Sequence, residues 1–361
     1  LGQSQQPGED QTPRDRNIFF EAVSMFGEDT SKAYVAFHYR MNRNFFVFIK
    51  NKGNLSQEEY IARGELIVEL LNEQGTSVGR EIRTIDLTRA TLPNPQEPQS
   101  DIQGAISFTV PDGTFNIVFE VDDRESGRTY VDRKQTVTTR RPNHKPMEAS
   151  IPFLAKMVIH EGAISPDFEV VNRGLDVVYG TSCGYVLQLF LPDLKDLRVQ
   201  WKMEGRWDDR FQEKQEQSGN EYTLYPGIPR LLAGDTEIKY EVTKSQYAWR
   251  MMYIPLPIEK LETGFYQVEF DITLGEIKTS LKRSFRVNWP NKPLSLTVYE
   301  LAVDALRLIA KEDEVEEMYG FTSVRGHQRF RDFWHKRDPD TTTAYNEVMA
   351  EFYRRVDEAL R

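Results

Sequence analysis

Residues Gly113–Val121 (GTFNIVFEV) decide the fold, because a glycine is followed there by an apolar side chain at every second position. These apolar residues are Phe115, Ile117, Phe119 and Val121. Side chains of a β-strand point alternately to the two faces of its sheet, and this spacing therefore predicts a strand with one buried face. The turn sequence before it predicts that the strand is one arm of a hairpin.

The same pattern recurs over Gly264–Ile272 (GFYQVEFDI), with apolar residues at the same offsets from the glycine. Each strand is followed by a second turn glycine, Gly127 or Gly275, and then by a final alternating strand. An internal repeat of this kind predicts two copies of one sandwich topology. The alternative stays open, since any two antiparallel hairpins share much of this pattern.

Outward from the first stretch, alternation of apolar and polar residues continues on both sides and no helical period competes before residue 140. Further strands are predicted at Ala33–Phe37, Phe45–Ile49, Leu66–Leu70 and Ile106–Val110. Short strands separated by turn signals at this spacing are typical of an immunoglobulin-like antiparallel β-sandwich. The chain is therefore predicted to be mainly β, with two such sandwiches in tandem.

The domain boundaries follow from changes in composition and periodicity. Residues 1–16 are rich in Gln, Gly, Pro and charge, which predicts a flexible tail. Residues 17–141 are assigned to the first sandwich and 142–290 to the second, with a Pro-containing basic linker between them. Residues 291–361 change to helical spacing, which predicts a short C-terminal α-helical segment.

Two apolar stripes lie in the predicted helical segment. The first predicted helix has a stripe formed by Val298, Leu301, Ala302, Ala305, Leu306 and Ile309. A later helix is predicted to run from about Thr343 to the chain end, with its own stripe after the Phe333-Trp334 pair. We expect this surface to bind a protein partner or a second copy through Phe333, Trp334, Tyr345, Met349, Phe352, Val356 and Leu360.

Composition excludes several classes of function. The 361 residues carry a net charge of −10, which makes nucleic acid a poor partner. The single cysteine, Cys183, allows no internal disulfide and no Cys-based zinc site, and is predicted to fill space in a core. No apolar run is long enough to predict a transmembrane segment.

Sequence motifs give no support for catalysis. The chain has no nucleophile elbow, phosphate loop or dinucleotide fingerprint, and its five histidines lack the spacing of a metal site. We therefore predict a protein that is not an enzyme, with no catalytic residue, cofactor or metal site. An alternative is a glycan-binding module that uses aromatic residues of the second sandwich, namely Trp201, Trp207 and Tyr222.

The C-terminal segment resembles the helical start of the GWxTD domain, a family of exported proteins of Bacteroidota and related bacteria. Three stretches carry the resemblance, namely Phe330–Pro339 (FRDFWHKRDP), Asn346-Glu347 and Glu351–Val356 (EFYRRV). The sandwich pair before them also resembles the N-terminal region of such proteins. The sequence departs from the family in one respect, since it stops at Arg361 before the Gly-Trp-x-Thr-Asp element.

The resemblance implies export and an association with the cell envelope, in the periplasm or at the cell surface. The first residue is Leu1 rather than Met, which fits either removal of an export signal or a fragment. The family brings no catalytic motif to carry over. We therefore expect an exported, structural scaffold or assembly subunit that works through protein–protein contacts.

Overall fold

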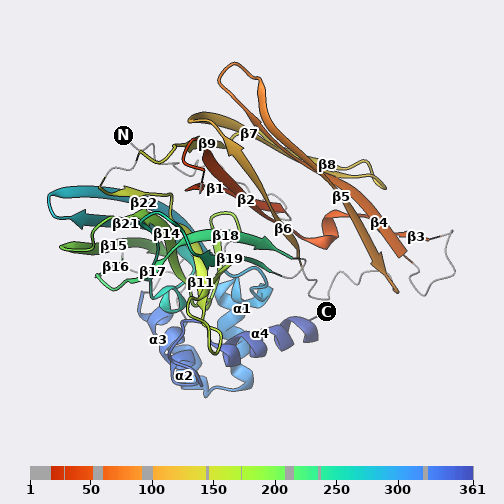
Figure 1. The fold of residues 1–361 in the computed structure, drawn as a ribbon. Helices are drawn as coiled ribbons and strands as arrows, with labels where there is room; N and C mark the ends of the chain where they lie inside the picture. The colour runs from red at the N-terminus through yellow and green to blue at the C-terminus, as the bar shows by residue number, and fades with distance from the viewer. Residues whose placement is uncertain are drawn as a thin grey trace.

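The computed structural model describes residues 18–27, 29–51, 60–91, 101–143, 146–171, 173–207, 215–234, 237–319 and 324–360. Antiparallel sheets make up most of this part of the chain and a short helical segment follows them (Figure 1), so the mainly β prediction is confirmed. The predicted tail, residues 1–16, lies outside the described residues. The immunoglobulin-like topology stays a prediction.

Two sheets belong to the first part of the chain. Sheet A has the order β1-β2-β6 and consists of β1 (Ile18–Phe26), β2 (Ala33–Met41) and β6 (Ile102–Val110). Sheet B consists of β3 (Ile49–Lys50), β4 (Tyr60–Leu71), β5 (Ser77–Arg89), β7 (Gly113–Asp123), β8 (Thr129–Asp132) and β9 (Thr136–Thr139).

Two further sheets belong to the second part. Sheet C consists of β10 (Glu148–Ala149), β11 (Phe153–Val158), β12 (Asp167–Val170), β14 (Gly184–Phe190), β17 (Thr223–Pro226), β18 (Ile228–Ala233), β19 (Ile238–Thr243) and β20 (Trp249–Pro255). Sheet D consists of β13 (Asp176–Val178), β15 (Leu197–Trp207), β16 (Gln215–Gly219), β21 (Gly264–Leu274) and β22 (Ile277–Asn288). Strand β13 runs parallel to β22, whereas the other pairs are antiparallel.

The four sheets stack in the order B-A-C-D, with an apolar core between each neighbouring pair. Phe37 of sheet A and Phe119 of sheet B belong to the first core, whereas Tyr185 and Phe270 belong to the core between sheets C and D. A third core joins the outer face of sheet A to sheet C, for example through Val23. Sheet A is therefore buried on both faces, which explains why β1 and β2 are apolar at almost every position.

The predicted repeat forms an antiparallel hairpin in both parts of the chain, but the returning strand differs. After Gly127 the return is divided into β8 and β9, which both pair with β7, whereas after Gly275 the single strand β22 pairs with β21. Gly113 and Gly264 each lie opposite the end of this return, at Thr139 and Val287. The turn glycines Gly127 and Gly275 have φ of +70° and +57°, a conformation that side chains disfavour. These turns are confirmed as the sequence predicted.

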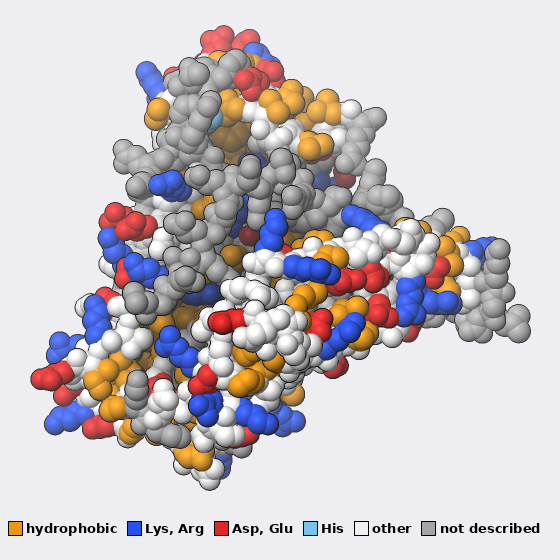
Figure 2. All heavy atoms as spheres, turned by 90° about the horizontal axis from the view of Figure 1, so that it is seen from above, with side chains coloured by type: hydrophobic (Ala, Val, Ile, Leu, Met, Phe, Trp, Pro, Cys, Tyr) orange, Lys and Arg blue, Asp and Glu red, His pale blue; other side chains and the backbone are white. Residues whose placement is uncertain are grey.

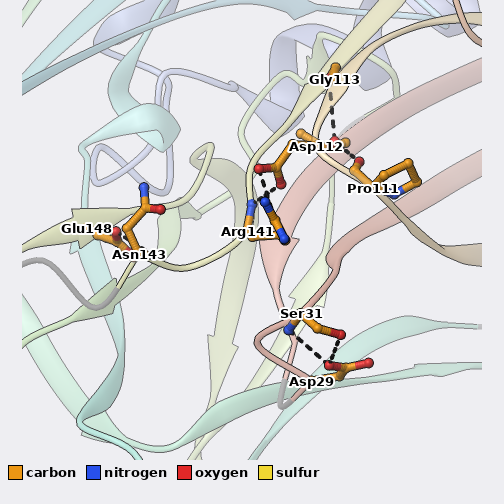
Figure 3. Close-up of polar contacts among 9 residues, drawn as sticks. Asp29, Ser31, Pro111, Asp112, Gly113, Arg141, Asn143 and Glu148 are labelled. Carbon is orange, nitrogen blue, oxygen red and sulfur yellow. Dashed lines mark hydrogen bonds and ion pairs between the residues drawn. The ribbon is translucent and has the colours of Figure 1, made fainter.

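The connection between the two parts is fixed by hydrogen bonds at both ends (Figure 3). The Arg141 amide N–H and Nε donate to the carboxylate of Asp112, at 2.5 and 3.1 Å. The Asn143 amide N–H donates to both carboxylate oxygens of Glu148, at 2.8 and 3.0 Å. The predicted linker therefore holds a defined path in its described residues.

The helical segment lies at the end of the molecule opposite sheet B (Figure 1). It consists of α1 (Tyr299–Ala305), α2 (Glu312–Glu316), α3 (Val324–His335) and α4 (Glu347–Ala359), with single 3-10 turns at Leu294–Leu296 and Leu306–Leu308. Two further 3-10 turns, Arg43–Phe45 and Ile258–Lys260, lie among the sheets.

Three local predictions were wrong. Phe45 lies in a 3-10 turn that precedes the two-residue strand β3, so the alternation across residues 45–49 was not one strand. The last helix begins at Glu347, because the Asn346 side chain caps it. In the first helix the buried face differs from the predicted stripe. Val298 and Leu301 of that stripe are exposed, and the residues that pack into the core are Ala302, Val303 and Leu306.

Candidate interaction surfaces

The Phe-Trp pair of the predicted partner surface lies inside the helical segment. Phe333 and Trp334 are 4% and 3% exposed, and both belong to a core that α1, α3 and α4 share. The Arg337 guanidinium lies 3.5 Å from the centre of the Phe333 ring. The prediction that this pair contacts a partner was wrong, because its surface is used up by packing within the chain.

Three more residues of that surface also pack internally. Met349 and Phe352 lie against the same helical core, and Tyr345 packs against the core of sheets C and D. The Tyr345 ring lies edge-on to those of Tyr179 and Trp289, at centroid distances of 5.7 and 5.4 Å. Tyr345 therefore holds the helical segment against the second sandwich.

The rest of the predicted stripe is at the surface. Val348 is 44% exposed and Leu360 is 73% exposed, whereas Val356 is half-buried. The stripe is thus divided between an internal face and an outer edge of α4. Only this outer edge remains accessible for the partner contact that the sequence predicted.

The aromatic residues of the glycan alternative are incorporated in the second sandwich. Trp201 is 7% exposed within the core of sheets C and D, and Trp207 and Tyr222 are half-buried against the same core. The Gly219 backbone lies close over the Trp201 ring, so a side chain there would collide with it. The prediction of a sugar-binding face on Trp201 was therefore wrong, because a stacking platform must be open to solvent.

A buried polar cluster joins sheets A, C and D, and no pattern in the sequence predicted it. The His38 Nε2 lies 2.6 Å from the Tyr240 hydroxyl oxygen, and its Nδ1 lies 3.9 Å from the Glu21 carboxylate. The Arg283 guanidinium makes an ion pair of 2.7 Å with Glu21. A carboxylate, an imidazole and a hydroxyl in this order could activate a nucleophile. Each is less than a tenth exposed, so the cluster is closed to a substrate and its role is to join the sheets.

Other chemistry-bearing groups are dispersed or buried. Within the described ranges, no group of three or more His, Cys, Asp or Glu residues is arranged to hold a metal ion. Cys183 lies in the core of sheets C and D, and burial, together with the charge of Glu259, raises the pKa of its thiol to about 12. The space-filling role predicted for Cys183 is confirmed.

The hollows on the surface of the described residues include two shallow ones. One, of about 420 Å³, is lined by Asn51 and by neighbouring residues of β4 and β5, and the other, of about 520 Å³, by residues of α3 alone. Each is a depression on one pair of strands or one helix, whereas ligand sites usually lie between elements. Among the described helices, none is long and apolar enough to cross a membrane.

The β4–β5 hairpin, Tyr60–Arg89, forms a long edge of sheet B (Figure 1). Within the described part of the chain β5 is hydrogen-bonded to one strand only, β4. No other described strand pairs with the opposite edge of its 13 residues, which can therefore accept a further strand. Most of its side chains are exposed, including Ile82 at 50%.

Charged and apolar side chains are interspersed over the face of the molecule in Figure 2, without one dominant patch of either sign. Strand β5 shows the same mixture, with Arg80, Glu81, Arg83, Asp86 and Arg89 along its length. Charges of this kind discourage indiscriminate pairing at an edge and favour a partner whose charges are complementary. This strand was not predicted, although the turn residues Asn72–Gly75 (NEQG) directly follow the predicted strand Leu66–Leu70 and indicate a returning strand.

Comparisons with known proteins add no assignment. No family model and no curated protein matches the chain. Among solved structures, a family 123 glycoside hydrolase from Clostridium perfringens is 11% identical over 54% of this chain, with a TM-score of 0.21. This chain spans 36% of that hydrolase.

Two other solved structures cover more of the chain at equally low similarity. Collagen adhesin from S. aureus is 10% identical over 75% of this chain and 93% of its own, with a TM-score of 0.18. A structure reported as manganese lipoxygenase of Gaeumannomyces graminis with a partial structure of zonadhesin of Komagataella pastoris is 12% identical. The match covers 74% of this chain and 93% of that chain, with a TM-score of 0.18. Similarity at this level carries no functional argument.

Proposed function

We propose that this chain is a non-enzymatic assembly subunit that works through protein–protein contacts. The observation that supports the proposal is the open edge of β5, which is long and exposed, and has Ile82 half-way along it. Backbone N–H and C=O groups along such an edge can extend the sheet into a partner by adding a strand. Other sheet edges are shorter, for example β8 with four residues and β16 with five.

The stacking of the sheets supports the same proposal. Sheet A is fixed between sheets B and C by two apolar cores and by the polar cluster around Glu21, so the β4–β5 hairpin is mounted on a rigid base. A pre-organised edge loses little conformational entropy when a partner binds. Export and location at the cell envelope belong to the proposal as what the GWxTD resemblance implies.

The test is the mass of the purified chain in solution, measured by light scattering over a wide range of concentrations. We expect a mass that rises with concentration, or a complex with a protein that co-purifies in a fixed ratio. A chain that stays monomeric at every concentration and carries no partner would contradict the proposed function.

A further inference from the structure

We propose that the occupant of the β5 edge is β5 of a second copy, in an antiparallel register with Ile82 opposite Ile82. The inference rests on the proposed function and names the partner of the same edge. Such a contact is isologous, so one two-fold axis would pass beside Ile82 and close the assembly at a dimer. Strand pairing would then join the two copies of sheet B into one continuous sheet.

Hydrogen bonding restricts the registers that are available. Along an edge strand, successive residues point their N–H and C=O groups alternately toward the neighbouring strand and away from it. Two residues that lie opposite each other must both point their N–H and C=O groups toward the partner strand or both point them away from it. In a pair of identical strands, opposite residues therefore differ in number by an even amount, and the residue at the two-fold axis lies opposite its own copy. Pairing with β4 is irregular at Leu70 and Leu71, so the regular part of β5 is residues 79–89. The axis lies beside one of these residues.

Charge then separates the possible registers. An axis at Arg83 would place that residue against its own copy, and an axis at Glu81 would do the same with two carboxylates. An axis at Ile82 instead places Glu81 of each copy opposite Arg83 of the other, twice across the interface. Their side chains are exposed by 47% and 40%, and within one copy their nitrogen and oxygen atoms are 3.7 Å apart. Both groups are therefore available to a partner.

Burial of Ile82 favours the same axis. Ile82 lies opposite Ile67 of β4, on the outer face of sheet B, and is half exposed there. The proposed register brings the two copies of Ile82 into direct contact and covers apolar surface on both. An axis at Thr84 is free of like charges too, but it sets Ile82 against Asp86 and each charge against a neutral residue. An axis at Ile85 also sets opposite charges together, Glu81 against Arg89, but Ile85 is only 9% exposed and has little surface left to cover. The register centred on Ile82 therefore gains both the ion pairs and the larger burial of apolar surface.

Disulfide formation tests the register directly. Paired residues on antiparallel strands lie close enough for a disulfide, so Ile82→Cys is expected to give a covalent dimer under mild oxidation. Thr84→Cys is the matched control, because it lies on the same face two residues further along. In the proposed register its two copies are separated by four residues, or about 13 Å, beyond the reach of a disulfide. The native Cys183 is 2% exposed and stays outside the reaction.

Charge reversal gives a second, reversible readout in the full-length chain. Glu81→Arg sets two positive pairs across the interface and is expected to raise the dimer dissociation constant about tenfold. The double variant Glu81→Arg with Arg83→Glu restores opposite charges and is expected to restore the native constant. Val131→Arg, on β8 at the other edge of sheet B, is the matched control and should leave the constant unchanged.

The outcomes distinguish this inference from the proposed function. Covalent dimers of Ile82→Cys without those of Thr84→Cys, together with rescue by the double charge reversal, support the Ile82 axis. Dimers of Thr84→Cys, or association in solution that none of these β5 variants alters, overturn the axis and leave the assembly function standing. A second protein bound at β5 in a fixed ratio also overturns it. A native chain that is strictly monomeric overturns both.

Discussion

The side chain of Gln188 completes the hydrogen bonding of the Phe26 backbone, although the two residues are 162 positions apart. The Phe26 N–H donates to Oε1 of Gln188 at 2.8 Å, and Nε2 of Gln188 donates to the Phe26 carbonyl oxygen at 2.9 Å. The amide therefore takes the place of a neighbouring strand at the end of β1. Gln188 is completely buried, and through this contact β14 of sheet C holds β1 of sheet A.

Replacement of Gln188 should weaken the junction between the two sandwiches. Gln188→Leu removes both partners of the Phe26 backbone in a buried position, and we expect a loss of about 2–4 kcal/mol in the free energy of unfolding. Urea denaturation followed by tryptophan fluorescence measures it. Gln200→Leu, at an exposed position of β15, is the control and should change that free energy by less than about 0.5 kcal/mol.

Gly180 is expected to be essential for docking of the helical segment on the second sandwich. Its φ is +80°, and a Cβ atom there would lie 2.7 Å from the Cβ of Tyr345. Gly180→Ala therefore combines backbone strain with a collision. Gly127→Ala is the matched control, since its φ is +70° and nothing lies within 4 Å of the added atom.

We expect Gly127→Ala to cost about 1 kcal/mol in the free energy of unfolding and Gly180→Ala at least about twice as much. The excess should also appear as faster amide hydrogen exchange in α4, because Tyr345 lies directly before that helix. Equal effects of the two substitutions would show that the Tyr345 contact contributes nothing to docking.

Removal of one hydroxyl should test the polar cluster between sheets A and C. Tyr240→Phe takes away the partner of His38 Nε2 and leaves that nitrogen unpaired in a dry interface. The expected loss is about 1–3 kcal/mol in the free energy of unfolding, measured by urea titration. Tyr225→Phe, on the same sheet, loses only a 3.3 Å contact with the Met157 sulfur and should be nearly neutral.

Asp167 should make stability depend on pH in acid. Burial by itself would raise the pKa of this carboxyl, but its contacts with Lys239 Nζ at 2.8 Å and His160 Nε2 at 3.1 Å outweigh burial and leave the pKa below the usual 3.8. A carboxyl whose pKa is lowered by folding stabilises the native state above its ordinary pKa. That contribution is lost as the pH falls through the lower, folded value.

We therefore expect Asp167→Asn to reduce the free energy of unfolding by about 1 kcal/mol at pH 7, and by progressively less as the pH is taken below 4. Urea titrations of both proteins from pH 7 to pH 2.5 provide the comparison. Gln200→Leu, which changes no ionisable group, serves as the control, and its effect should not vary with pH in this way. A constant difference across the range would contradict the assignment.

Local structure was largely predictable, whereas the candidate surface was not. The hairpins that begin at Gly113 and Gly264 form as the alternation of their residues indicated. A strand with one solvent-exposed face and one buried face has polar and apolar residues in alternation, and this pattern can be read from the sequence. Strand β5 was not predicted because Arg83, with 40% of its side chain exposed, interrupts the apolar residues on the inner face before Ile85. An edge strand that is exposed on much of both faces shows little alternation of polar and apolar residues.

The sequence by itself determined where strands give way to helices, and which glycines turn the chain. Both follow from local periodicity and from the conformations that glycine alone adopts without strain. Only the tertiary structure decided which apolar faces meet. It buried sheet A on both sides, placed Phe333 and Trp334 inside the helical core, and brought Glu21, His38 and Arg283 together. These contacts join residues far apart in the chain, so no local pattern specifies them.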